Sequence, residues 1–128
     1  MKIIVVDDKR SMRSAMAKIL VSLGFEDITM AEDGREGWEM IRQAFGDKET
    51  AGFDLIVSDM EMPRMSGLEL LESVRSTPGL DRTPFIMATT VSEKQIILKT
   101  MRLGVSAYIL KPFDPPMVEF KLRQAGIL

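Results

Sequence analysis

Four apolar runs in this sequence end at polar residues that could carry out phosphoryl chemistry. The closing residues are Asp7 with Asp8, then Asp59, Thr89 and Lys111. If the runs are parallel strands, their carboxyl ends share one edge of a sheet, where open α/β sheets bind ligands. Carboxylate oxygens suit Mg²⁺, and a carboxylate can attack phosphorus to form an aspartyl phosphate. The pattern therefore predicts magnesium-dependent transfer of a phosphoryl group to a carboxylate.

The three carboxylates are expected to differ in role. Asp59 stands alone after the central apolar run, so it is the predicted nucleophile. Asp7 and Asp8 are predicted to bind metal with it, because clustered carboxylates repel one another and a divalent cation relieves the repulsion. Lys111 offers a point charge to a phosphoryl oxygen, and Thr89 offers a neutral hydroxyl. Each residue alone has an ordinary explanation as a strand end or a helix cap, so the prediction depends on the joint pattern.

The composition favours a globular domain and excludes several kinds of site. The 128 residues fit a single domain, 1–128, and the net charge of −2 argues against direct binding of nucleic acid. Cysteine and histidine are both absent, which removes disulfides, thiolate metal sites and a histidine phosphoacceptor. The sequence has no apolar stretch long enough to insert into a membrane and no signal-peptide pattern. The expected location is the cytoplasm.

Strand-like and helix-like segments alternate along the chain, which predicts an α/β fold with a parallel sheet. The expected strands are 2–7, 27–31, 54–58, 85–88 and 107–110. The expected helices are 11–23, 35–45, 68–76, 92–103 and 114–124. Ser11 is the predicted N-cap of the first helix, and Ser66 or Gly67 should open the third. A polar loop is expected at 46–52.

Short motifs at the strand ends and turns form one combined pattern. They are Val5-Val6-Asp7-Asp8, Ala31-Glu32-Asp33-Gly34, Ser58-Asp59-Met60-Glu61-Met62-Pro63, Met65-Ser66-Gly67, Ala88-Thr89-Thr90, Gly104-Val105-Ser106-Ala107-Tyr108 and Leu110-Lys111-Pro112-Phe113. On these motifs nearly the whole chain resembles the receiver domains of response regulators in two-component signalling, especially single-domain regulators of the CheY type. The resemblance implies a doubly wound, flavodoxin-like α/β fold, with five parallel strands in the order 2-1-3-4-5 and five helices.

The resemblance also implies a set of site roles. Asp59 would accept a phosphoryl group from the phosphohistidine of a sensor histidine kinase. Mg²⁺, or Mn²⁺ in its place, would be held by Asp8, Asp59 and the backbone carbonyl of Glu61, with Asp7 acting mainly through water. Thr89 and Lys111 would contact the phosphoryl group.

In the family that the chain resembles, phosphorylation draws the threonine inward and the aromatic residue follows, here Thr89 and Tyr108. This movement would repack a face made by the fourth helix, the fifth strand and the fifth helix, where a downstream protein target binds. The face expected on this chain comprises Ile96, Lys99, Thr100, Leu103, Ala107, Tyr108 and residues 117–121. Glu61, Thr90 and Val91 occupy positions that tune kinetics in the family, and they predict slow to moderate self-dephosphorylation.

Several functions fit this chemistry. The leading hypothesis is a monomeric signalling switch rather than a metabolic enzyme, with chemotaxis as one pathway. A relay intermediate that passes phosphate to a histidine phosphotransfer protein is a second, and the regulatory domain of a transcription factor is a third. A magnesium-dependent phosphatase for small molecules is disfavoured, because that pattern needs a second Asp two residues after the first-strand Asp. Lys9 and Arg10 occupy those positions.

Overall fold

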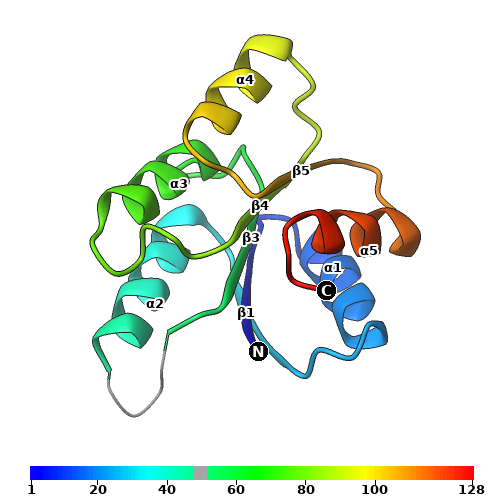
Figure 1. Cartoon of the computed structure of the whole chain (residues 1–128), viewed down its shortest axis with the longest axis horizontal. Helices are drawn as coiled ribbons and strands as arrows, with labels where there is room; N and C mark the ends of the chain where they lie inside the picture. Colours follow the sequence, from blue (N-terminus) through cyan, green and yellow to red (C-terminus); the bar gives the residue numbers. More distant parts are fainter. Residues whose placement is uncertain (48–51) are drawn as a thin grey trace.

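The computed structural model describes residues 1–47 and 52–128. Five parallel strands form one sheet in the order β2-β1-β3-β4-β5, which confirms the predicted fold class and strand order. Figure 1 shows α1 and α5 on one side of the sheet and α2 and α3 on the other. Most of the loop predicted at 46–52 lies outside the described residues.

Strands and helices alternate strictly, and each strand leads into a helix. The strands are β1 (Lys2–Val6), β2 (Asp27–Ala31), β3 (Leu55–Ser58), β4 (Phe85–Thr89) and β5 (Ala107–Leu110). The helices are α1 (Arg10–Ser22), α2 (Gly34–Gly46), α3 (Gly67–Ser76), α4 (Lys94–Arg102) and α5 (Pro115–Gln124). In the described part of the chain, none of the helices combines the length and apolar character that a bilayer crossing requires.

The central strands are apolar throughout because both faces of the sheet are covered. Side chains alternate across a strand, so Ile4 and Val6 belong to the core beneath α2, α3 and α4. Ile3 and Val5 belong to the second core, beneath α1 and α5. The continuous apolar runs of the sequence are therefore the central strands of a two-sided α/β core.

The starts of three helices are fixed by side-chain caps. Ser66 and Glu69 form a capping box at α3, which confirms Ser66 as the opening residue. The carboxylates of Asp33 and Asp114 cap α2 and α5. Each accepts one backbone N–H bond from the third residue of its helix, Glu36 in α2 and Met117 in α5. These polar residues stop the preceding segment and satisfy N–H groups that the helix itself leaves unpaired.

The predicted cap at Ser11 is wrong. α1 begins at Arg10, and its N-cap is Lys9, which has no capping side chain. Asp7 lies immediately after β1, and its Oδ1 accepts a 2.9 Å bond from the Lys9 N–H. The chain therefore turns directly from strand to helix around a site carboxylate, and Ser11 is already inside the first helical turn.

Candidate functional site

Three carboxylates converge at the carboxyl edge of the sheet. β1 and β3 are neighbours, with Val6 opposite Ser58, so the residues that follow them emerge side by side. Carboxylate oxygens of Asp7, Asp8 and Asp59 all lie within 4.8 Å of one another. Asp7 and Asp59 are 5% and 6% exposed, whereas Asp8 is open to solvent. The predicted cluster thus forms, with two members buried and one at the mouth.

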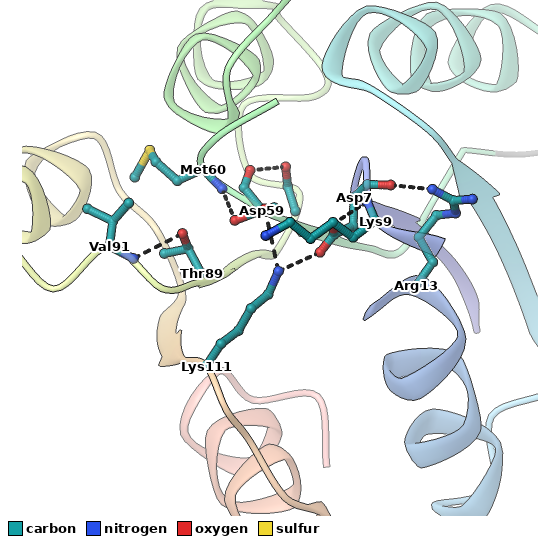
Figure 2. A network of polar contacts seen from close by, with 9 residues as sticks. Asp7, Lys9, Arg13, Asp59, Met60, Thr89, Val91 and Lys111 are labelled. Carbon is teal, nitrogen blue, oxygen red and sulfur yellow. Dashed lines mark hydrogen bonds and ion pairs between the residues drawn. The ribbon is translucent and has the colours of Figure 1, made fainter. Parts of the chain in front are cut away.

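Lys111 supplies the cation of the site. Its Nζ lies 2.7 Å from Asp7 Oδ2 and 3.4 Å from Asp59 Oδ2 (Figure 2). The Lys111 N–H donates to the Thr89 carbonyl, which anchors the lysine beside the end of β4. Three carboxylates against one ammonium leave an excess of negative charge in a largely buried place. A hard divalent cation with oxygen ligands fits both that charge and that donor set.

The Asp59 side chain is held by its own backbone surroundings. Its Oδ1 accepts a 2.7 Å bond from the Met60 N–H, and its carbonyl accepts a 2.8 Å bond from the Ser58 hydroxyl. At Gly67 a Cβ atom would lie 2.0 Å from the Asp59 carbonyl oxygen, so no side chain fits there. The start of α3 therefore packs directly on the backbone of Asp59 and fixes its position.

Thr89 and Tyr108 are joined through a single loop residue. The Thr89 hydroxyl accepts a 3.2 Å bond from the Val91 N–H, and the Tyr108 hydroxyl donates a 2.7 Å bond to the Val91 carbonyl. Thr89 is fully buried and Tyr108 is 8% exposed. Burial, reinforced by the negative charge of Asp59, raises the pKa of the Tyr108 phenol. The phenol is therefore neutral and acts as a donor to the loop after β4.

Two of the residues expected to tune kinetics are open to solvent. Glu61 and Thr90 are exposed, and Val91 is half-buried. No hydrogen bond or ion pair involves the Glu61 side chain within residues 1–47 and 52–128. The structure thus brings Asp7, Asp8, Asp59 and Lys111 together, and leaves Glu61 at the rim.

Only part of the expected target face lies at the surface in this conformation, and its role as a target face remains a prediction. Ala107 and Tyr108 are buried in the two cores, and Thr100 is fully buried with its hydroxyl donating to the Ile96 carbonyl. β5 is an edge strand, but Tyr108 lies in the core on one face of the sheet and Ala107 and Ile109 lie in the core on the other, so most of its side chains are not at the surface. The exposed part of the face comes from the two helices.

Arg13 is a site residue that the sequence patterns did not reveal. Its Nη1 donates a 2.7 Å bond to the Asp7 carbonyl, and its Nη2 lies 3.9 Å from Glu32 Oε1. The side chain is only 11% exposed. The sequence feature that could have indicated this role is a basic residue one turn into the helix that follows Asp7 and Asp8. Arg13 braces the end of β1 against α1 and the segment after β2.

Comparison with known proteins agrees with this geometry. A family model described as the response regulator receiver domain matches residues 3–123. The chain is 38% identical over 122 residues to the chemotaxis protein CheY1 of Helicobacter pylori, covering 95% of this chain and 94% of that protein. It is 36% identical to a chemotaxis protein CheY homolog of Campylobacter jejuni, covering 95% and 89% of the two chains.

A solved structure gives the same result. The chemotaxis protein CheY4 of Vibrio cholerae superposes with a TM-score of 0.83 at 30% sequence identity, covering 97% of each chain. The family match includes residues of all five strands, and the alignment with CheY1 covers 95% of this chain. The chain therefore belongs to the response regulator receiver domain family, and within it is similar to CheY.

Proposed function

We propose that residues 1–128 form a single receiver domain that accepts a phosphoryl group on Asp59 from a sensor histidine kinase. The observation that carries this proposal is the position of the Asp59 carboxylate. It is buried, with one oxygen accepting from the Met60 N–H and the other 3.4 Å from Lys111. A carboxylate held in one orientation beside a cation is suited to in-line attack on phosphorus.

In the proposed reaction an Asp59 oxygen attacks the phosphorus of a phosphohistidine. The new P–O bond forms as the P–N bond breaks, and the electron pair returns to the imidazole nitrogen, which takes up a proton. In this scheme Lys111 binds one phosphoryl oxygen and offsets the negative charge of the transferred group, and the Thr89 hydroxyl donates to another phosphoryl oxygen. Engagement of Thr89 is therefore expected to break its present bond to Val91.

Mg²⁺, or Mn²⁺, fits the donor set at this edge. Asp8, Asp59 and the Glu61 carbonyl would hold it, with Asp7 acting through water. When bound, the cation neutralises negative charge on the phosphoryl oxygens. The protein's own contribution is to keep carboxylates close together at a partly buried position, a charge arrangement that favours cation binding.

The proposed output is a change on the face formed by α4, β5 and α5. Val91 connects the two ends of this switch, because its N–H bonds to Thr89 and its carbonyl to Tyr108. Movement of Thr89 would release Val91 and change the packing of Tyr108 against α4. A downstream protein would then distinguish the two states, and the relatives named chemotaxis proteins favour a chemotaxis pathway. Glu61 at the rim is expected to slow hydrolysis by water.

The test is the intact mass of the protein after incubation with acetyl phosphate, with and without Mg²⁺. We expect a gain of one phosphoryl group that needs Mg²⁺ and is lost in Asp59→Asn. Asp27→Asn is the matched control, because Asp27 is an exposed residue of β2 far along the strand from the site edge. A gain of equal size in Asp59→Asn would refute the assignment, as would the absence of any gain in the wild type.

A further inference from the structure

A groove borders α2 and the turn that precedes α3, on the side of the sheet occupied by those two helices (Figure 1). Arg35, Trp38 and Arg42 line it from one face of α2, and Arg64 and Met65 line it from the turn. Trp38 and Met65 also pack against the core, so the floor is apolar and anchored. The groove is separate from the acidic cluster and from the face proposed for output.

The lining of the groove carries one net positive charge, on a chain whose net charge is −2. Its lining holds three arginines and two glutamates, Glu39 and Glu69. Glu39 makes only an exposed 3.7 Å pair with Arg35, and Glu69 is engaged in the α3 capping box. Exposed pairs of this kind contribute little, so an incoming carboxylate can compete for Arg35.

The other two arginines are also accessible to an anion. The Arg42 guanidinium stacks over the Trp38 ring, 5.5 Å from its centroid, and within the described residues it has no carboxylate at ion-pair distance. The Arg64 side chain is 68% exposed and lies 3.8 Å from Asp33 Oδ2, while the other oxygen of Asp33, Oδ1, caps α2. Each guanidinium carries five N–H donors, which is more than these contacts use.

The turn that carries Arg64 is held in an unusual conformation. Arg64 has a φ of 69°, a value that costs free energy for a residue with a side chain. A Cβ on Gly34 would lie 2.0 Å from the Met65 carbonyl oxygen, so the turn packs directly against the start of α2. This close packing fixes the backbone of the turn relative to α2, and the turn places Arg64 in the same groove as Trp38.

We propose that this groove binds an acidic peptide segment of a partner protein. An apolar side chain would pack on Trp38 and Met65, and flanking carboxylates would bind Arg35 and Arg64. Tryptophan, arginine and methionine are the residues enriched at protein interfaces, and an arginine can hold a carboxylate with two parallel bonds. Binding at this surface does not depend on Asp59.

The first experiment selects ligands from a random peptide library displayed on phage, using the intact chain as bait. The test variant is Arg35→Gln/Arg64→Asn, in which asparagine tolerates the positive φ. The control is Arg82→Gln/Arg123→Gln, which removes two exposed arginines elsewhere. We expect peptides with carboxylates around an apolar residue to be retained by wild type and control and lost by the test variant. If no selected sequence depends on Arg35 and Arg64, the proposal is wrong.

The second experiment uses Trp38 emission, since Trp38 is the single tryptophan of the chain. A selected peptide should change the emission saturably, with a Kd about tenfold weaker in the test variant. Circular dichroism establishes that both double variants are folded. ATP is titrated in parallel. If ATP binds more tightly than the peptide and its binding depends on the two arginines, the ligand of the groove is a nucleotide and the peptide proposal is wrong. A Kd that weakens equally in the control would reduce the effect to net charge and overturn the proposal.

Discussion

The two ends of the sheet each hold a cation, but they satisfy it in opposite ways. At the carboxyl edge, Lys111 pairs with ionisable carboxylates of Asp7 and Asp59. At the amino end of β4 and β5, the Arg75 guanidinium donates to neutral carbonyls: 2.7 Å to Thr83, and 2.8 and 3.1 Å to Gly104. The ion pairs of Lys111 can rearrange when a charged group is added at the carboxyl edge, whereas the hydrogen bonds of Arg75 only connect segments of the fold.

Arg75 has a structural role, and its surroundings do not favour its charge. Burial lowers the pKa of its guanidinium, and the nearby charge of Asp81 partly opposes that effect. It links α3 to the loop before β4 and to the turn after α4. We therefore expect Lys111, whose partners are acids, to affect the chemistry, and the half-buried Arg75, whose partners are carbonyls, to act as a brace. The same distinction predicts which substitutions affect chemistry and which affect stability.

The largest expected effect is on the rate of phosphorylation in Lys111→Met. Loss of the ammonium removes the point charge beside Asp59, so we expect phosphoryl acceptance from acetyl phosphate to slow by about 100-fold. Intact mass followed over time measures this. Lys94→Met, at an exposed position of α4, is the control and should keep the wild-type rate. If Lys111→Met is phosphorylated at the wild-type rate, Lys111 has no role in the chemistry, and the proposed difference between Lys111 and Arg75 is wrong.

Gly67→Ala probes how tightly the reactive edge is packed. The added methyl group would meet the Asp59 carbonyl oxygen at 2.0 Å, so the start of α3 must shift. We expect a loss of about 3 kcal/mol in the free energy of unfolding, together with slower phosphorylation. Urea denaturation and the mass assay measure the two effects. Gly46→Ala, where the added atom meets nothing within 4 Å, should change neither.

Arg75→Met is the converse experiment at the other end of the sheet. Leaving the Gly104 and Thr83 carbonyls without their donor should reduce the free energy of unfolding by about 2 kcal/mol. The rate of phosphorylation should stay near that of the wild type. Urea denaturation is the measurement, with Arg82→Gln as the control for lost charge. A folded, stable Arg75→Met protein with impaired phosphorylation would show that the brace takes part in the chemistry.

The smallest expected effect is on the ionisation of Tyr108. Burial and the Asp59 charge both disfavour the phenolate, so the phenol should titrate above its ordinary pKa. In Asp59→Asn the pKa should fall, though it should stay raised because burial is the larger cause. Ultraviolet absorbance of the phenolate reports it directly, since the chain has a single tyrosine. An unchanged titration in Asp59→Asn would mean that the site charge does not reach Tyr108.

Local patterns in the sequence were sufficient for the elements and for the acidic cluster. Apolar runs without alternation predict the central strands, and the prediction that Ser66 or Gly67 opens α3 is confirmed with Ser66 as the N-cap, because periodicity and capping act over a few neighbouring residues. Parallel strands then bring their carboxyl ends to one edge, so Asp7, Asp59 and Lys111 meet as expected. The magnesium site, the phosphoacceptor role and the output face remain predictions.

Only the tertiary structure decided the features that depend on contacts between distant segments. Arg75 and Gly104 are 29 residues apart, and nothing in the sequence pairs a guanidinium with that particular carbonyl. Arg13 turns toward the Asp7 carbonyl rather than toward solvent, and Tyr108 is buried with its hydroxyl donating to the Val91 carbonyl. Backbone carbonyls are present at every residue, so sequence alone does not select among them. The packing of helices on the sheet makes that selection.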